Sequence, residues 1–465
     1  MPVAKANASV HHEIMAREIL ARVMEARRRS DALFSIVRAD SLYNRPIAER
    51  HRIIFYVGHL EAFDRNLLGG ILGLTTFRPT FDRLFAFGID PVEGGLPVDQ
   101  PSDWPALEEV RTYVREIRAA IDEKLSCGVL DSKELESAAA ADDGFSLGTL
   151  LNVAIEHRLM HVETLAYMLH QLPHDKKIKQ LDRPGLVTPA VLHKMLEIPE
   201  GTAVLGLSRT RDSESFGWDN EYPAHTVHVP AFEIDQYMVT NRQYLDFMAA
   251  GGYETRALWT DDDWKWIRAG QIAHPVFWKR REQSKQSRDN KSDSWLYRTM
   301  FEDISLPLDW PVYVSHAEAA AYARWVKKSL PTEAEWHRAA FGTHGGRQRT
   351  YPWGSAVPSE KFGNFDFHRW DPAPVNAHNA GRSAFGVQGM IGNGWEWTST
   401  IFAPFRGFEP FPFYRGYSAD FFDGRHYVMK GGSARTAACM LRPTFRNWFQ
   451  GHYQYVYAGF RCVNR

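Results

Sequence analysis

Two histidines lie four residues apart in the segment EHRLMHVETLAYML, residues 156–169. Apolar residues recur through this segment at steps of three and four, a spacing that predicts an amphipathic helix. His157 and His161 fall on the apolar row of that helix, between Ala154 and Leu165. A buried imidazole needs partners for its ring nitrogens. Because two imidazoles at positions i and i+4 can converge on one ion, the pair indicates a metal site.

A third ligand is expected from the segment YVGHLEAFDRNLL, residues 56–68, where His59 is an isolated polar residue on an apolar stripe. Metal sites in helix bundles are built from inward side chains on facing helices, which makes His59 a candidate. His51 is an alternative that the periodicity does not separate from it. Glu163 is expected to orient one of the imidazoles through its second ring nitrogen. The competing interpretation is a set of ordinary hydrogen-bonded core histidines.

The elements that must position these histidines are long helices. Four segments carry the helical spacing, with a long connection between the second and the third, and together they predict a four-helix bundle. We expect the bundle to occupy residues 1–175, a polar, proline-marked linker to occupy residues 176–195, and a second domain to occupy residues 196–465. The four helical segments are residues 11–34, 50–73, 104–126 and 146–172.

The second domain has a different composition, with frequent glycine, proline and tryptophan and only short apolar segments. Strands are expected within residues 225–239, 425–434 and 457–463. A hydroxyl residue is followed three positions later by an acid or amide at Thr240, Ser315 and Thr332, and each of these pairs predicts a capping box at the start of a helix. The mixture predicts an irregular α+β domain held together by aromatic packing.

The composition of the chain excludes several classes of partner. Its 465 residues carry a formal net charge of −1, without the basic bias that binding to nucleic acid or to a membrane surface needs. No apolar run approaches the roughly 20 residues of a spanning helix, and the N-terminus lacks a signal-peptide core. We therefore expect a cytoplasmic protein. The three cysteines, Cys127, Cys439 and Cys462, match no zinc module, so a metal must rest on histidines and carboxylates.

The spacing of His157, His161 and Glu163 resembles the DinB-like bundle of the ergothioneine-type sulfoxide synthases, EgtB and its relatives. In that family an upstream histidine completes an iron site, and the context VGHLEAF favours His59 over His51. The blocks SLPTEAEWHRAAFG, YPWG, GNGWEWTST, MKGGSA and YAGFRC resemble the C-type-lectin-like formylglycine-generating-enzyme (FGE-sulfatase) domain. The two resemblances together span nearly the whole chain, and their combination is far more specific than any single block.

The resemblance implies an oxygen-dependent enzyme with Fe(II) held by His59, His157 and His161. Its small-molecule substrates would be hercynine, which is trimethylated histidine, and a thiol, joined as a sulfoxide. The motifs FAFGIDP and PSDWP favour the members that use cysteine instead of γ-glutamylcysteine. Three neutral ligands leave ferrous iron cationic with open positions, which suits this reaction. Zinc and copper bind such nitrogens more tightly, so the identity of the metal rests on the resemblance.

The resemblance also implies the substrate-binding residues Asn447 and Trp448, in the block FRNWFQ. The quaternary ammonium of hercynine is best held by aromatic faces. Many members that use γ-glutamylcysteine have an aspartate after the tryptophan, where this chain has Phe449. This departure leaves open how the donor end is held, and a structural loop with a packed tryptophan is the alternative interpretation.

Two further pairs follow from the same resemblance. Tyr414 and Tyr417, in FYRGYS, fall in the stretch that carries a catalytic tyrosine, which would deliver a proton and separate sulfoxide formation from oxidation of the thiol alone. Arg78 and Arg83 fall where the family supplies arginines to the sulfur donor, and a guanidinium suits a carboxylate. Aromatic packing in a loop and solvated surface arginines are the respective alternatives.

Three other functions compete with this interpretation. Sister enzymes would share the scaffold and use a selenosugar, or histidine in an ovothiol-type reaction. Formylglycine generation needs a copper-binding cysteine pair, whereas Cys439 stands alone in the matching region and Cys462 belongs to the GFRC ending. A lectin-like protein without catalysis is the last alternative, and the complete histidine set argues against it. The blocks GNGWEWT and PTEAEW are expected to stabilise the fold and to have no part in catalysis.

Overall fold

A computed structural model describes the chain over residues 2–75, 78–86, 96–126, 145–181, 185–209, 216–281 and 294–465, with side chains from residue 17 onward. The chain divides into two compact units, Met1–Gln180 and Leu181–Arg465. The division falls within the segment expected to be a linker, residues 176–195. Cys127 and residues 87–91 of the motif FAFGIDP lie outside the described residues.

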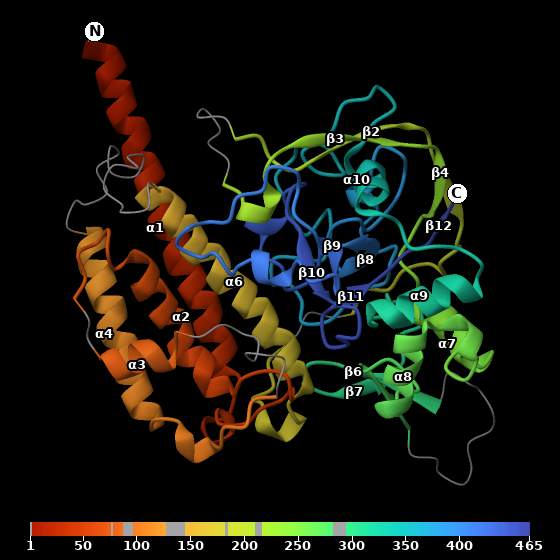
Figure 1. The fold of residues 1–465 in the computed structure, drawn as a ribbon, viewed down its shortest axis with the longest axis horizontal. Coiled ribbons are helices and arrows are strands. Elements are labelled where there is room, and N and C mark those ends of the chain that lie inside the picture. Colours follow the sequence, from red (N-terminus) through yellow and green to blue (C-terminus); the bar gives the residue numbers. More distant parts are fainter. Residues whose placement is uncertain are drawn as a thin grey trace. The chain divides into compact units, whose positions relative to one another are not determined.

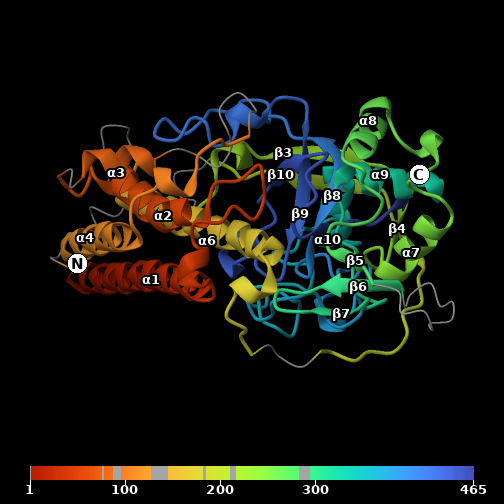
Figure 2. The same cartoon turned by 90° about the horizontal axis from the view of Figure 1, so that it is seen from below.

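In the described part of the first unit, four long helices lie alongside one another (Figure 1). α2 packs on α4 and on α6, and α1 packs on α6. The short helix α3, Pro79–Leu84, lies next to α2 (Figure 2). The four-helix bundle is therefore confirmed. The long helices are α1 (Pro2–Ser35), α2 (Ile53–Leu68), α4 (Leu107–Ser126) and α6 (Leu147–Gln171).

α6 is the most deeply buried helix of the bundle. It begins at Ser146, whose hydroxyl accepts a hydrogen bond from the amide of Thr149, which satisfies a backbone donor that the first turn leaves unpaired. Most residues of α6 are buried, Glu156 and Arg158 included, so the helix lacks the wide exposed polar face that the amphipathic pattern predicted. Among the helices of the described residues, none has the length and apolar character to cross a bilayer.

The second unit is built on small sheets. β10, β9, β8 and β11 form a four-stranded sheet in that order, and Figure 2 shows β10, β9 and β8 side by side. Within the described residues, three smaller sheets have the orders β1-β4-β12, β2-β3 and β5-β6-β7. Strands are present in each of the three segments where they were expected. The strands are β1 (Met195–Ile198), β2 (Gly201–Leu205), β3 (His225–Val229), β4 (Phe232–Asp235), β5 (Trp278–Arg280), β6 (Trp295–Arg298), β7 (Asp303–Ser305), β8 (Gly394–Ile401), β9 (His426–Gly432), β10 (Asn447–Gln450), β11 (Ala458–Gly459) and β12 (Val463–Asn464).

Helices of the second unit begin where the capping boxes predict them. Thr240, Ser315 and Thr332 each bind the backbone amide three residues later, and the acid or amide there binds back to the cap. The three predicted boxes are therefore confirmed. The helices are α7 (Asn241–Ala249), α8 (Asp261–Ala269), α9 (His316–Trp325) and α10 (Glu333–Phe341).

The tryptophan motifs form the interior of the second unit. Trp336 of the PTEAEW block donates its indole N–H to Glu396 of the GNGWEWT block at 2.9 Å. Glu396 also forms a fully buried ion pair with Arg461, at 2.6 Å from the guanidinium Nε. Trp397 donates to the carbonyl of Val314 at 2.8 Å. These contacts join segments far apart in the sequence, and they confirm that both blocks serve the fold.

Candidate metal centre

Three imidazoles converge in the core of the bundle. The Nε2 atom of His161 lies 3.1 Å from Nε2 of His157 and 3.3 Å from Nε2 of His59. All three side chains are buried, and one nitrogen from each lies within 4.8 Å of the others. Across the part of the chain that the structure describes, this is the one group of three or more histidines, cysteines or carboxylates close enough to hold an ion. His51 is not part of the group, and its ring instead packs on Phe55.

A backbone carbonyl fixes the orientation of His59. Nδ1 of His59 lies 2.7 Å from the carbonyl oxygen of Phe85, just after α3, so Nδ1 carries the proton and donates. In a neutral imidazole the other nitrogen, Nε2, is then a bare acceptor that faces the two remaining rings. Phe85 could not be predicted as part of the site, because a backbone acceptor leaves no residue-type signal.

Burial keeps the three imidazoles neutral. It lowers the pKa of His59 to about 4, although the hydrogen bond to Phe85 opposes the shift. Burial also lowers the pKa of His157 and of His161 well below the ordinary value. A proton on one Nε2 can satisfy one neighbour only, so three neutral Nε2 atoms at these distances cannot all be paired among themselves. A shared cation satisfies all three lone pairs, and neutral imidazole nitrogen is a ligand for zinc, copper, iron and nickel.

Aromatic rings of α2 cover the imidazoles. The ring of Phe63 stacks on His157 with centroids 3.4 Å apart, and the ring of Phe55 stacks on His59 at 4.8 Å. These phenylalanines lie four residues before and after His59, one helical turn to either side. An apolar shell of this kind limits access of water and lowers the local dielectric constant. Glu163 is also buried, and its expected role in orienting a ligand stays a prediction.

A buried ion-pair network joins the two helices that carry the histidines. Arg158 of α6 donates to both carboxylate oxygens of Glu61, each at 2.9 Å, and to Asp64 of α2 at 2.6 Å. Burial alone would raise the pKa of Glu61, but the positive charges of Arg158 and Arg118 outweigh burial and lower it to about 2. This network was not predicted from the sequence, although an arginine next to His157 in the predicted helix was a signal for it.

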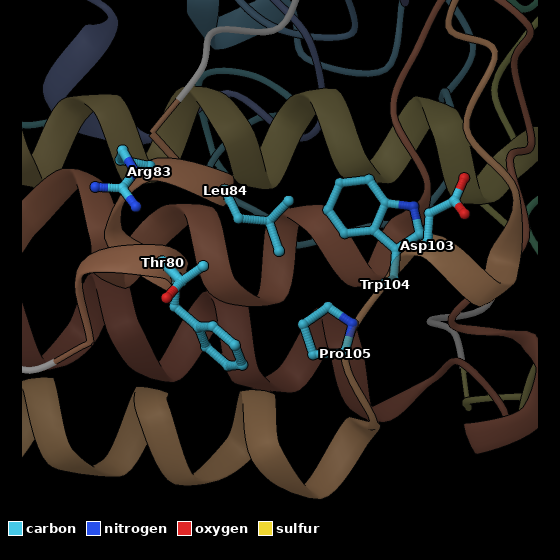
Figure 3. A pocket seen from close by; sticks show the side chains of 7 residues that line it. Thr80, Arg83, Leu84, Asp103, Trp104 and Pro105 are labelled. Atoms are coloured by element: carbon cyan, nitrogen blue, oxygen red, sulfur yellow. The ribbon is translucent and has the colours of Figure 1, made fainter.

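The structure places the two arginines predicted to bind the donor at either end of α3. Arg78 lies close to Glu116, with its Nε 3.3 Å from the carboxylate, and it is partly exposed. Arg83 lines a hollow of about 670 Å³ together with Phe81, Leu84 and Trp104. Figure 3 shows Arg83 on one side of this hollow and Trp104 on the other. A cation beside apolar walls can bind an anionic small molecule.

Asn447 and Trp448 begin β10, which pairs with the buried strand β9. The indole of Trp448 stacks on Phe402 with centroids 4.2 Å apart, and the rings of Tyr417 and Phe421 approach it at 5.3 and 5.7 Å. The half-buried Trp448 is therefore surrounded by aromatic rings, whose faces attract a quaternary ammonium. Phe449, the residue that departs from the family pattern, stacks on Tyr453.

The two candidate tyrosines differ in burial. Tyr417 is 8% exposed and stacks on Trp218 at 3.9 Å, whereas Tyr414 is half-buried. The loop that carries them is fixed by Ser418, which donates to Asp219 at 2.5 Å and accepts from Asn220 at 2.9 Å. Burial raises the pKa of Asp219 to about 6, against the opposing hydrogen bond from Ser418.

Further buried and half-buried polar residues hold the chain next to Asn447. Arg446 donates to Glu333 at 3.0 Å, and Lys430 donates to the carbonyl of Phe445 at 2.6 Å. Arg442 donates to Glu221, at 2.8 Å from its Nε. These residues were not predicted as parts of the site, because their partners lie far away in the sequence.

Comparison with known proteins agrees with the two-unit architecture. The DinB superfamily matches residues 23–165, and the sulfatase-modifying factor enzyme 1-like domain matches residues 186–465. A protein of Mycolicibacterium smegmatis named hercynine oxygenase is 35% identical, covering 83% of each chain. A hercynine oxygenase of Mycolicibacterium thermoresistibile is 37% identical, covering 69% of each chain. Ergothioneine biosynthesis protein 1 of Neurospora crassa is 28% identical, covering 91% of this chain and 55% of that protein.

Proposed function

Because the chain belongs to the hercynine oxygenase (EgtB) family, we propose that it is an oxygen-dependent sulfoxide synthase of ergothioneine biosynthesis with non-haem Fe(II). In the proposed reaction the enzyme joins the sulfur of cysteine to the imidazole of hercynine. The observation that carries the proposal is the convergence of three neutral, buried Nε2 atoms on one point. Three neutral ligands supply no negative charge, so an anionic thiolate can complete the set.

The proposed reaction is balanced by one molecule of dioxygen. A C–H bond of the hercynine imidazole and the S–H bond of the thiol are broken, and a C–S bond and an S–O bond are formed. The four electrons released reduce dioxygen, with one oxygen atom retained in the sulfoxide and the other leaving as water. Iron, when bound, supplies the activation of dioxygen and a position for the thiolate.

The remaining roles belong to side chains of this chain. His59, His157 and His161 hold the metal, and the phenylalanines stacked on their rings exclude water. Asn447 and Trp448 bind hercynine, and the aromatic surroundings of Trp448 support this role.

A tyrosine of the loop between β8 and β9 delivers a proton. Tyr414 is more exposed than Tyr417, which favours Tyr414 for this role. Arg83 binds the carboxylate of the sulfur donor. Its place beside the apolar walls of the hollow supports that assignment, whereas Arg78 lies within ion-pair distance of Glu116.

The same scaffold would also suit a sister enzyme that takes a selenosugar, or histidine in place of hercynine. Formylglycine generation is disfavoured by the cysteines, since Cys462 is fully buried and burial raises the pKa of its thiol well above the ordinary range. A buried thiol with a raised pKa is a poor copper-binding thiolate.

Mass spectrometry of a single reaction mixture tests the proposal. Enzyme loaded anaerobically with Fe(II) is given hercynine with equal amounts of cysteine, γ-glutamylcysteine and a selenosugar, and then oxygen. We expect hercynylcysteine sulfoxide as the main product. A selenium adduct would reassign the pathway, and the absence of any adduct would overturn the proposed function.

A further inference from the structure

Gly58 immediately precedes His59 in the middle of α2. A Cβ atom at this position would lie 2.6 Å from ring atoms of Phe85, closer than side chains approach one another in folded proteins. The backbone of Gly58 is helical, so the glycine is not required by its conformation. Glycine within a helix is less favourable than alanine. What this glycine provides is room for the ring of Phe85 to lie directly against the helix.

The ring of Phe85 is held from its other sides as well. Phe85 is fully buried, and its ring stacks with Tyr113 of α4 at 5.8 Å and with Trp104 at 6.1 Å. Trp104 is itself fixed by a hydrogen bond of 2.8 Å from its indole N–H to Asp99. Phe85 therefore has a well-defined position, set by α2 on one side and by two aromatic rings on the others.

The main-chain carbonyl of the same residue accepts a hydrogen bond from His59. The carbonyl oxygen of Phe85 lies 2.7 Å from Nδ1 of His59, while Nε2 points at the other two imidazoles. In metal sites, an acceptor for the second ring nitrogen of a ligand histidine fixes its tautomer and its orientation, and loss of such a partner typically weakens binding roughly 10- to 100-fold.

We infer that Phe85 is the positioning residue for His59, and that the missing side chain of Gly58 sets the position of Phe85. The ring packs on Gly58, and this contact presents the backbone carbonyl to Nδ1 and leaves Nε2 free to bind a metal. The inference rests on the proposed function for the presence of the metal. It adds a role for two residues that have no ligand atoms of their own.

The substitution Gly58→Ala tests the inference in the full chain, with Co(II) alone as the probe. The added methyl group must displace the ring, and with it the carbonyl. We expect the dissociation constant of Co(II) to rise roughly 10- to 100-fold and the visible Co(II) absorption to change, since that absorption reports ligand geometry. The matched control is Gly70→Ala, just after the same helix, where a Cβ would meet no atom within 4 Å. Gly70→Ala should bind Co(II) as the unmodified chain does.

A double-mutant cycle separates positioning from a general effect on the helix. In the background Phe85→Ala the ring is absent, so Gly58→Ala should add no further loss of Co(II) affinity. A purely structural effect of alanine on α2 would instead be the same in both backgrounds. The Phe85→Ala background also provides the test if Gly58→Ala alone does not fold, because unchanged Co(II) affinity in Phe85→Ala would overturn the inference.

The outcomes distinguish this inference from the proposed function. Unchanged Co(II) affinity and absorption in Gly58→Ala, together with loss of Co(II) binding in His157→Ala, would overturn the role of Phe85 and keep the metal centre. Retained Co(II) binding in His157→Ala would overturn the metal centre itself. Weakened binding in Gly58→Ala that depends on the ring of Phe85 would establish the inference.

Discussion

His59, His157 and His161 stand on two long helices whose contacts are fixed by a buried ion-pair network, whereas Asn447 and Trp448 stand on a short strand next to loops. The histidines face one another directly, and their surroundings are apolar rings. The surroundings of Trp448 are other aromatic side chains, supplied by segments far from it in sequence. One ion-pair network joins the two helices of the histidine group, whereas separate polar residues hold each segment next to Asn447.

The first prediction concerns the helical site and has the largest effect. His157→Ala should abolish metal binding and turnover, because two remaining imidazoles leave the set incomplete. We expect a loss of at least about three orders of magnitude in kcat/KM, the scale seen when a catalytic group is removed. Metal content and kcat/KM are the measurements.

The matched control is His170→Ala, which removes another buried histidine of α6 outside the metal group. His170→Ala should retain the metal. Full activity in His157→Ala would contradict the assignment of the site.

The second prediction concerns Asp219, which accepts a hydrogen bond from the tyrosine loop, and the pH dependence of stability. Burial raises the pKa of Asp219 from its ordinary value of 3.8 to about 6, so the folded state keeps a proton that the unfolded state releases. The free energy of unfolding should therefore fall as pH rises from 4 to 6, relative to Asp219→Asn, by at most about 3 kcal/mol. Urea unfolding at several pH values measures the difference.

Asp263 provides a comparison with the opposite sign. Burial would raise its pKa, but hydrogen bonds from His452 and Thr260 outweigh burial and lower it. Replacing Asp263 by asparagine should remove a contribution to stability that is lost as pH falls. A pH-independent difference between the unmodified chain and Asp219→Asn would show that Asp219 does not titrate as described.

The third prediction separates the two sites. Trp448→Ala should raise the KM for hercynine about tenfold, the equivalent of a cation–π contact of ~1.4 kcal/mol. Metal affinity should stay unchanged, since all three proposed ligands lie in the other unit.

The control for this variant is Trp353→Ala, which removes another stacked tryptophan of the second unit. Its KM for hercynine should be that of the unmodified enzyme. An unchanged KM in Trp448→Ala would remove this residue from the substrate site.

The fourth prediction has the smallest effect and concerns the products. Tyr414→Phe removes the hydroxyl proposed to donate a proton and keeps the ring, so a several-fold larger share of oxidised thiol relative to sulfoxide is expected. Mass spectrometry of the products gives the ratio. If Tyr417→Phe changes the ratio and Tyr414→Phe does not, then Tyr417 is the donor in spite of its packing on Trp218.

Helical periodicity explains why the bundle and the histidine group could be predicted from the sequence. An isolated polar residue on an apolar stripe is visible in a helix, so the pair at His157 and His161 was evident. Periodicity left His51 and His59 equivalent, and the family context distinguished them before the structure placed His59 against the pair. The capping boxes were equally local signals and were found correctly.

The contacts that could not be predicted are those between distant residues. Glu221 and Arg442 are separated by 221 positions, and neither has a local pattern that indicates the other. The carbonyl of Phe85 belongs to the backbone, which has the same acceptor at every position. Such groups can be given a role only when the tertiary contacts of the fold are known.

The separation of the histidines along the chain has a consequence for chain topology. His59 and His161 are 102 positions apart. An ion bound by both would close the intervening segment into a loop, and a cross-link around a loop of about 100 residues lowers the entropy of the unfolded chain by the equivalent of roughly 4.7 kcal/mol in the chain-entropy description of disulfides. The metal would act as a removable cross-link between α2 and α6. Metal supply would then set the resistance of the bundle to unfolding as well as its chemistry.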